Sequence, residues 1–151
     1  MSNRPPQVLR LHEGSIALPN GYEDRTANLF VPVTDTKLLP NLSIARDWMR
    51  ENETLPDYVT RQIGLLKANL PGHKVLARAP ASLGREAVLA GEQIDASHKA
   101  GGQTIHQRQA AFEVAPRRAL IFTATMPGLP HPEFDAYWRA WLASFTLRSD
   151  A

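Results

Sequence analysis

The chain has 151 residues, of which 43% are hydrophobic and 21% charged, and its formal net charge is +2. This length is typical of one domain, and the hydrophobic fraction allows a buried core and argues against global disorder. Basic residues are spread among acidic ones, so the charge pattern does not indicate nucleic-acid binding. The sequence contains no cysteine, which excludes disulfides, thiolate metal sites and a cysteine nucleophile.

The start of the chain, MSNRPPQVLRLHEG, lacks the apolar segment of a secretory signal peptide. No run of about 18 apolar residues occurs, so the sequence predicts no membrane-spanning helix. We therefore expect a soluble cytoplasmic protein. It is predicted to have a flexible N-terminal tail over residues 1–7, one domain over residues 8–147 and a C-terminal tail over residues 148–151.

Short strands separated by turns are predicted for most of the chain, because apolar and polar residues alternate. Asn20 and Gly21 mark a turn early in the chain, residues 34–41 form a loop, and the Gly101-Gly102 pair marks a hairpin turn. The predicted strands span residues 8–13, 15–19, 25–33, 42–48, 73–82, 84–96, 104–114 and 118–126.

Two helices are predicted from apolar stripes at helical spacing. The first covers residues 55–72, with Pro56 and Asp57 in its first turn and Pro71-Gly72 at its end. Its stripe is Val59, Ile63, Leu66 and Leu70. The second covers residues 131–147, and its stripe is Phe134, Trp138, Trp141 and Phe145.

The order of these elements, strands then helix then strands then helix, does not form regular βαβ units. The predicted fold class is therefore α+β, with a mostly antiparallel curved sheet and two principal helices on one face of it. Phe112, Leu120 and Phe122 fall on one side of their strands and are natural core partners for the aromatic helix.

The opposite side of the strands has an unusual composition. A simply solvated face is normally rich in Lys and Glu. This face is instead small and apolar, with amides and hydroxyls among the apolar side chains. Such residues allow close approach of another helix and hydrogen-bond its polar atoms, as they do between membrane helices. The face comprises Ala27, Leu29, Val31, Ser43, Ala45, Ile105, Gln107, Gln109, Ile121 and Thr123. It is predicted either to hold an apolar helix or to be covered by a second copy of the chain or by its own loops.

No motif for catalysis or metal binding is visible. The five histidines lack ligand spacing, Ser15 is not in a nucleophile elbow, and the glycine turns lack the phosphate-loop pattern. We therefore expect no enzyme activity, no catalytic residue, no metal and no cofactor. An alternative stays open, in which a small-ligand-binding protein or enzyme has a sheet-lined pocket. It would use His106 or His12 with Glu13 or Asp24 as acid and base.

Four segments together resemble the Eag-type chaperones of bacterial type VI secretion, a DcrB-related group with a PsbP-like fold. They are LRLHEGSIALPNGYEDRTANLF, SIARD, DYVTRQIGLLKANLPGHK and HQRQAAFEV. The resemblance runs from about Val8 to Phe145 and depends on the ordered combination of segments. It implies a chaperone, dimeric or of higher order, that binds the N-terminal transmembrane helices of a Rhs-type effector carrying a PAAR domain. The chaperone would shield these helices and help to load the effector onto the secretion apparatus.

The resemblance also implies client-binding residues. Gln62 and Gln109 match the glutamines of two Arg-Gln pairs, whose amides hydrogen-bond polar groups of the bound helices. Gln107 joins them because it shares the strand face of Gln109. Five further positions are apolar in the family, although Ser43 is more polar and Ala27 smaller than expected. These five are Ala27, Leu29, Ser43, Leu70 and Ile105. Leu70 also continues the apolar stripe of the first helix, so both a core role and a groove role are open for it.

Overall fold

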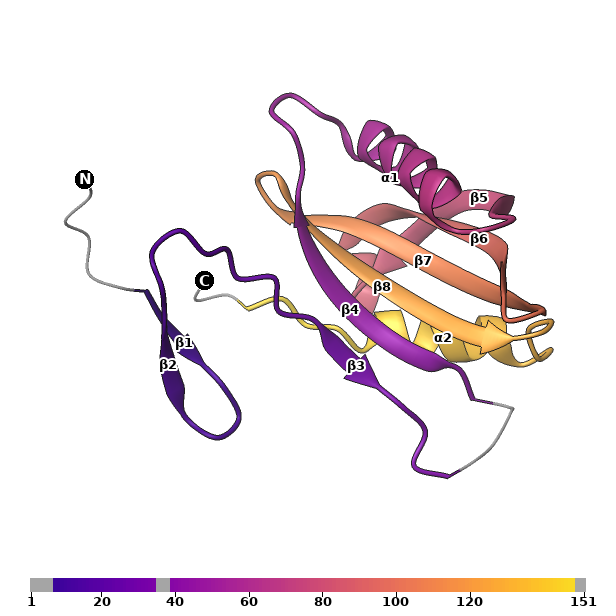
Figure 1. The fold of residues 1–151 in the computed structure, drawn as a ribbon, viewed down its shortest axis with the longest axis horizontal. Coiled ribbons are helices and arrows are strands. Elements are labelled where there is room, and N and C mark those ends of the chain that lie inside the picture. The colour runs from indigo at the N-terminus through magenta and orange to yellow at the C-terminus, as the bar shows by residue number, and fades with distance from the viewer. Residues whose placement is uncertain (1–6, 35–38, 149–151) are drawn as a thin grey trace.

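The computed structural model describes residues 7–34 and 39–148. Within these residues, six strands form an antiparallel sheet in the order β3-β4-β8-β7-β6-β5 (Figure 1). The sheet strands are β3 (Asn28–Phe30), β4 (Asn41–Trp48), β5 (Lys74–Leu83), β6 (Leu89–Ala100), β7 (Gln103–Ala115) and β8 (Arg118–Pro127). The other elements are β1 (Gln7–Arg10), β2 (Ser15–Leu18), α1 (Leu55–Asn69), α2 (Phe134–Ala143) and the short 3-10 turn η1 (Arg85–Ala87).

Local sequence signals explain where α1 begins and ends. Thr54 is the N-cap, and its hydroxyl accepts a hydrogen bond from the backbone N–H of Asp57 at 3.2 Å. Pro56 lies in the first turn, where a missing N–H is tolerated. Gly72 follows the helix with φ of +64°, a conformation that favours glycine. The predicted first helix is confirmed, ending three residues earlier than expected.

Two predicted strands are shorter than expected. The strand predicted over residues 25–33 is reduced to β3, which pairs with only three residues of β4. The strand predicted over residues 84–96 begins only at Leu89, because η1 interrupts it. Glu86 and Ala87 have φ values of 65° and 53°, so the chain cannot be extended there. The predicted tail over residues 1–7 lies outside the described residues except for Gln7, which begins β1.

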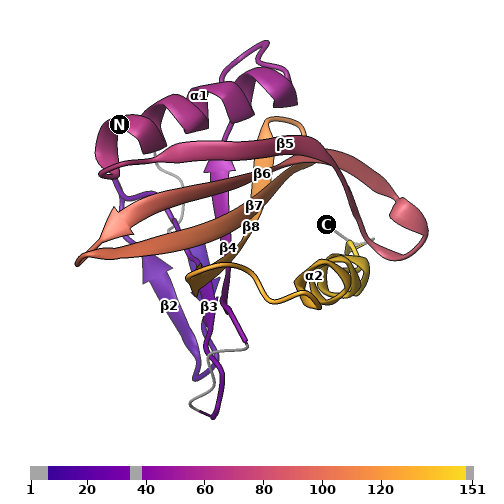
Figure 2. The same ribbon diagram turned by 90° about the vertical axis from the view of Figure 1, so that its right-hand side faces the viewer.

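The two helices cover opposite faces of the sheet. Ala110 and Phe112 of β7 belong to a core with Trp138 of α2, whereas Ala111 belongs to a second core with Tyr58 of α1. Successive strand residues point to opposite faces, so the helices lie on either side of the sheet, as Figure 2 shows. The α+β class, with its antiparallel sheet and two helices, is confirmed. The prediction that both helices pack on one face is wrong.

The α2 face contains an aromatic core. Trp138 is 1% exposed, and its indole N–H donates to the side-chain oxygen of Gln93 at 3.0 Å. The ring of Phe122 lies edge-on to those of Phe112 and Trp141, with centroids 5.9 and 5.4 Å away. Each fully buried side chain of this size contributes about 1.5–3 kcal/mol. The predicted aromatic stripe is therefore confirmed as a core element. The helix itself covers only Phe134–Ala143 of the predicted residues 131–147, so Phe145 packs on this core from beyond the end of α2.

Strands β1 and β2 form a hairpin separate from the six-stranded sheet. Figure 1 shows it apart from the main body, connected through the extended chain that leads to β3. Among the described residues, no helix has the length and apolar composition needed to cross a membrane.

Candidate functional site

The α1 face of the sheet is only half covered. One row of paired residues crosses all six strands on this face, because residues directly opposite in an antiparallel sheet point the same way. From β3 to β5 the row is Leu29, Ser43, Thr123, Gln109, Ile94 and Arg78. Helix α1 packs over β6 and β7, where Ile94 is 4% exposed. Leu29, at the uncovered end of the row, is 70% exposed.

A groove of about 430 Å³ lies between α1 and the part of the sheet that α1 does not cover, and it is called here the α1 groove. This volume lies within the range of ligand-binding clefts. Its α1 wall is Tyr58, Val59, Gln62 and Leu66. Its sheet wall includes Ser43, Ala45, Asp47, Ile94, Gln107, Gln109, Ala111, Ile121 and Thr123, with Arg25, Arg46 and Glu92 completing the lining. The floor therefore combines small apolar side chains with amides and hydroxyls.

Four of the eight predicted client-binding residues line the α1 groove, namely Ser43, Gln62, Gln107 and Gln109. The other four do not. Leu29 and Ile105 lie on the same sheet face, Leu29 opposite Ser43 in the register and Ile105 two residues before Gln107. Ala27 is exposed immediately before β3.

Leu70 is the C-cap of α1 and belongs neither to the core clusters nor to the groove lining. Leu66 of the same stripe lines the groove instead. Tyr58 and Leu66, which the sequence analysis did not select as site residues, lie one helical turn on either side of Gln62. Their spacing of four residues from Gln62 is the sequence signal that could have identified them as site residues, because it places them on the same side of the helix. Asp47 carried no such signal, because its role depends on contacts with α1.

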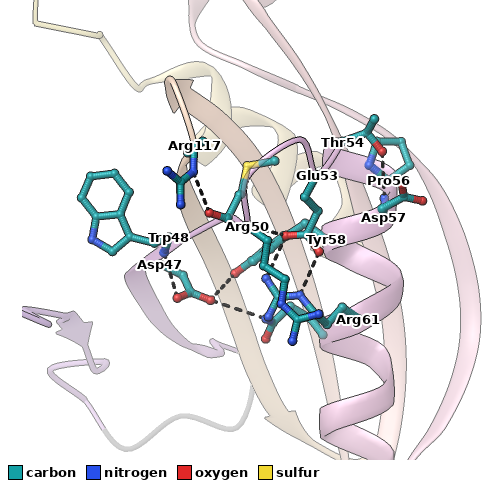
Figure 3. Close-up of polar contacts among 12 residues, drawn as sticks. Asp47, Trp48, Arg50, Glu53, Thr54, Pro56, Asp57, Tyr58, Arg61 and Arg117 are labelled. Carbon is teal, nitrogen blue, oxygen red and sulfur yellow. Dashed lines mark hydrogen bonds and ion pairs between the residues drawn. The ribbon is translucent and has the colours of Figure 1, made fainter.

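Asp47 is the centre of a polar cluster at the end of the groove (Figure 3). Its Oδ2 accepts hydrogen bonds from Tyr58 Oη at 2.8 Å and from Gln62 Nε2 at 3.4 Å. Its Oδ1 accepts from the backbone N–H of Trp48 at 2.9 Å. Burial, and then the hydrogen bond to Asp47, raise the pKa of Tyr58, so that the phenol stays a protonated donor.

An ion pair between Glu53 and Arg61 holds the start of α1. Glu53 accepts from Arg61 Nε at 2.8 Å and from Arg61 Nη2 at 2.9 Å, and also from the backbone N–H of Arg50. The hydrogen bonds from Arg61 lower the pKa of Glu53 to about 2 against the opposing effect of burial. This bidentate geometry fixes the loop between β4 and α1, and with it one wall of the groove.

The charged groups around the groove form hydrogen bonds or ion pairs with other parts of the protein. Arg46 donates to the carbonyl of Thr26 at 3.2 Å and to Asn28 Oδ1 at 2.8 Å, which ties the chain before β3 to β4. Glu92 forms an ion pair with Arg78 at 2.8 Å. Arg46 and Asp47 are therefore held by uncharged hydrogen-bond partners, and Glu92 is held by an ion pair.

A larger cavity, about 640 Å³, lies on the opposite face between β5, β6 and α2. Arg108, one of the two arginines that line it, forms ion pairs of 2.7 Å with both Asp95 and Asp135 and stacks over the ring of Phe134. These contacts connect α2 to the sheet and leave no unpaired charge on Arg108. We assign this cavity to the packing of α2 rather than to a binding site.

The residues considered for acid and base chemistry are not brought to the groove. His106 has the same strand parity as Ala110 and Phe112 and so points to the α2 face, and His12 is exposed in the β1–β2 turn. Asp24 accepts hydrogen bonds from the backbone N–H and the hydroxyl of Thr26, which shapes the turn before β3. In the part of the chain that the structure describes, no group of three or more His, Asp or Glu could hold a metal ion.

The fold and the groove define an α+β protein whose antiparallel sheet carries a half-covered, amide-containing face. The chain belongs to the DcrB family, whose model matches residues 13–144. A relative in Pseudomonas aeruginosa, named effector EagT6, is 30% identical over 129 residues, which are 83% of this chain and 87% of that protein. The resemblance to Eag proteins predicted from the sequence is thereby confirmed.

Among solved structures, the fold is similar to that of PA94 from Pseudomonas aeruginosa, described as a putative regulator of unknown function. The TM-score is 0.73 at 24% sequence identity, and the match covers 95% of this chain and 97% of that one. A weaker likeness, with a TM-score of 0.43 at 14% identity, is to LpqN of Mycobacterium tuberculosis, which is involved in cell envelope biogenesis. It covers 83% of this chain and 84% of that one.

Proposed function

We propose that this protein is a cytoplasmic chaperone of type VI secretion. It binds the N-terminal transmembrane helices of a PAAR/Rhs-type effector, shields them from water before export and helps to load the effector onto the secretion apparatus. The relation to effector EagT6 supports an effector-associated role. The observation that carries the proposal is the α1 groove, which combines an apolar floor with hydrogen-bonding side chains on a half-covered sheet face.

The composition of the groove suits an apolar helix. A transmembrane helix outside the membrane must bury its apolar side chains and must still satisfy any polar side chain that it carries. Ala45, Ala111 and Ile121 provide a low apolar floor, and Gln109 and Thr123 place polar atoms within it. Small residues with interspersed hydroxyls and amides are the partners that helices use inside membranes.

The side chains of the groove support a binding role rather than catalysis. Its two carboxylates, Asp47 and Glu92, are both engaged by donors of the protein itself. A general base has to reach a substrate proton with a free lone pair in a suitable geometry. We therefore infer that the protein is not an enzyme and acts without a cofactor.

We also propose that the protein is a homodimer, in which the β1–β2 hairpin of each chain packs on the partner. One face of the hairpin is apolar, with the cross-strand pair Leu9 and Ile16 next to Leu18. Ile16 is 57% exposed, and a two-stranded hairpin alone is at best marginally stable in water. A reciprocal exchange of hairpins would bury this face in both chains at once.

Co-expression tests the chaperone proposal. The N-terminal segment of a PAAR/Rhs-type effector from the same genome is produced with and without this protein, and the segment recovered in the soluble fraction is quantified. We expect recovery only with the chaperone. Ile121→Gln, on the groove floor, should reduce capture about tenfold, because it places an amide against an apolar helix.

The matched control is Leu76→Gln on β5, which makes the same kind of change at a side chain that is 50% exposed and outside the groove lining. It should capture the segment as the unmodified chain does. Leu29→Gln and Ile105→Gln test whether the binding surface extends beyond the groove along the same face. Equal recovery of the segment with and without the chaperone would contradict the proposal, as would full capture by Ile121→Gln.

A further inference from the structure

The contacts of Asp47 fix the orientation of an amide in the α1 groove. Tyr58 and Gln62 are four residues apart on α1, so their side chains lie on one side of the helix, and both reach Asp47 Oδ2. A carboxylate only accepts hydrogen bonds. The group of Gln62 that faces Asp47 must therefore be the NH₂, and the amide oxygen points away from Asp47.

The amide oxygen of Gln62 is therefore available to a ligand. Gln62 lines the groove, and no hydrogen bond to its Oε1 is found among the described residues. Tyr58 also holds Asp47 in place, because its hydroxyl donates to the same Oδ2 at 2.8 Å. Asp47 lies on β4 and its two side-chain donors lie on α1, so the orientation is set where the helix meets the sheet.

A second amide, that of Gln107, also lies in the groove. Gln107 Nε2 donates to the hydroxyl of Thr125 at 3.2 Å, which leaves the oxygen of Gln107 without a partner in the described residues. Gln107 lines the groove on the β7 side, across from Gln62 on α1. A hydroxyl can donate or accept, so Thr125 does not fix the orientation of the Gln107 amide as Asp47 fixes that of Gln62. The oriented acceptor of the groove is therefore Gln62.

We propose that the α1 groove selects helices that carry side-chain hydroxyl donors, serine or threonine, and that Asp47 is the positioning residue that fixes Gln62 as their acceptor. The inference rests on the proposed chaperone function and names the chemistry of its client. In a helix interior the backbone N–H groups are bonded within the helix, so the donors left for a partner are side-chain groups. A buried amide oxygen that finds no donor carries a desolvation penalty.

The inference is tested with three probe segments of about 20 Leu and Ala residues, the length of a transmembrane helix. Each is fused to the same soluble carrier protein and carries serine, alanine or valine at its centre. Dissociation constants are measured in a mild detergent with the full-length chaperone. We expect the serine segment to bind about tenfold more tightly than the alanine and valine segments, the effect of one buried hydrogen bond.

Asp47→Asn should reduce the preference for serine to about twofold or less. The new asparagine can face Gln62 with either end of its amide, so the orientation of Gln62 is no longer fixed. Gln62→Met, which keeps the length of the side chain without an acceptor, should remove the preference, so that the serine, alanine and valine segments bind alike. Asp57→Asn is the matched control, because it makes the same chemical change on an exposed residue outside the groove.

A combined variant separates positioning from a merely structural role. In Asp47→Asn with Gln62→Glu, the asparagine donates to one oxygen of the glutamate, and the second oxygen faces the groove as an acceptor. The preference for serine should return. Equal binding of all three segments by the unmodified chain would overturn the inference and leave the chaperone proposal standing. Binding of none of them would overturn both.

Discussion

His73 lies between α1 and β5, and its two ring nitrogens are buried and have no hydrogen-bond partner among the described residues. Burial lowers its pKa from the usual 6.5, and the charges of His98 and Lys67 lower it further. The folded protein therefore binds a proton at His73 less readily than the unfolded chain does. As the pH falls below 6.5, proton uptake favours unfolding.

We expect the unfolding temperature to fall between pH 8 and pH 5.5 and His73→Gln to reduce that fall. Differential scanning calorimetry at both pH values measures it. His12→Gln is the control, because His12 is exposed in the β1–β2 turn. A pH dependence that is unchanged in His73→Gln would assign the effect to another group.

Glu53 is a second single residue for which we predict an effect on stability. Its carboxylate accepts two hydrogen bonds from Arg61, and the side chains of Arg61 and Glu53 are 22% and 9% exposed. Glu53→Gln should lower the free energy of unfolding by about 2 kcal/mol at neutral pH, the usual size for a charge-assisted pair with little exposure. Urea denaturation measures the change, with Glu51→Gln on the exposed neighbour as control.

The stabilisation that Glu53 provides should decrease as the pH falls. The pKa of Glu53 is lowered from 4.5 to about 2 in the folded state, so its stabilising effect is complete above pH 4.5 and is lost as the pH falls toward 2. The difference between Glu53→Gln and the unmodified chain should therefore shrink over this window. A difference that is constant down to pH 2 would contradict the pairing with Arg61.

Gly91 of β6 and Gly64 of α1 differ in the space that a side chain would have at each position. A Cβ on Gly91 of β6 would lie 2.3 Å from the carbonyl oxygen of Ala111 and 2.5 Å from the ring of Phe112. A Cβ on Gly64, in the middle of α1, would meet nothing within 4 Å. Gly91 is therefore required for close approach of β6 to β7, whereas Gly64 is not required by packing.

We expect Gly91→Ala to lower the free energy of unfolding by about 1–3 kcal/mol, as overpacked core positions do. Gly64→Ala should raise it by about 0.5–1 kcal/mol, because alanine is the better helix former. Thermal and urea unfolding of both variants, made in the same background, measure these opposite signs. Stabilisation by Gly91→Ala would show that β6 and β7 are further apart than described.

At the scale of the whole molecule, the prediction concerns the oligomeric state, which we expect to depend on the β1–β2 hairpin. If its apolar face packs on a second chain, the protein should be a dimer by light scattering after size-exclusion chromatography. Ile16→Asp should shift it to a monomer, because a charge would be buried on the face that also carries Leu9. Val8→Asp is the control, since Val8 lies on the other face of the hairpin and is 67% exposed.

Monomers of the unmodified chain at all tested concentrations would contradict the exchange. So would equal disruption by Ile16→Asp and Val8→Asp. Because the sequence contains no cysteine, cysteines introduced into the hairpin and into the sheet would report by cross-linking which surface the hairpin contacts.

Alternation and helical spacing in the sequence determined the elements and the sorting of side chains between the two sides of each strand. Phe112 and Phe122 were predicted to pack on the aromatic helix, and they do. Gln107, Gln109 and Thr123 were predicted to share the other face, and they line the α1 groove together. These properties depend on spacing within one element, which the sequence states directly.

Only the tertiary structure decided which face each helix covers, because an amphipathic helix packs equally well on any complementary apolar surface. The same limit explains why the sequence analysis selected only some of the residues that line the α1 groove. Leu66 rather than Leu70 reaches the α1 groove, since Leu70 is already at the end of α1. Ile105 lies outside the α1 groove, although it points to the same face of the sheet as Gln107. The contact between Asp47 and Gln62 depends on how β4 and α1 approach each other, which the spacing within either element does not specify.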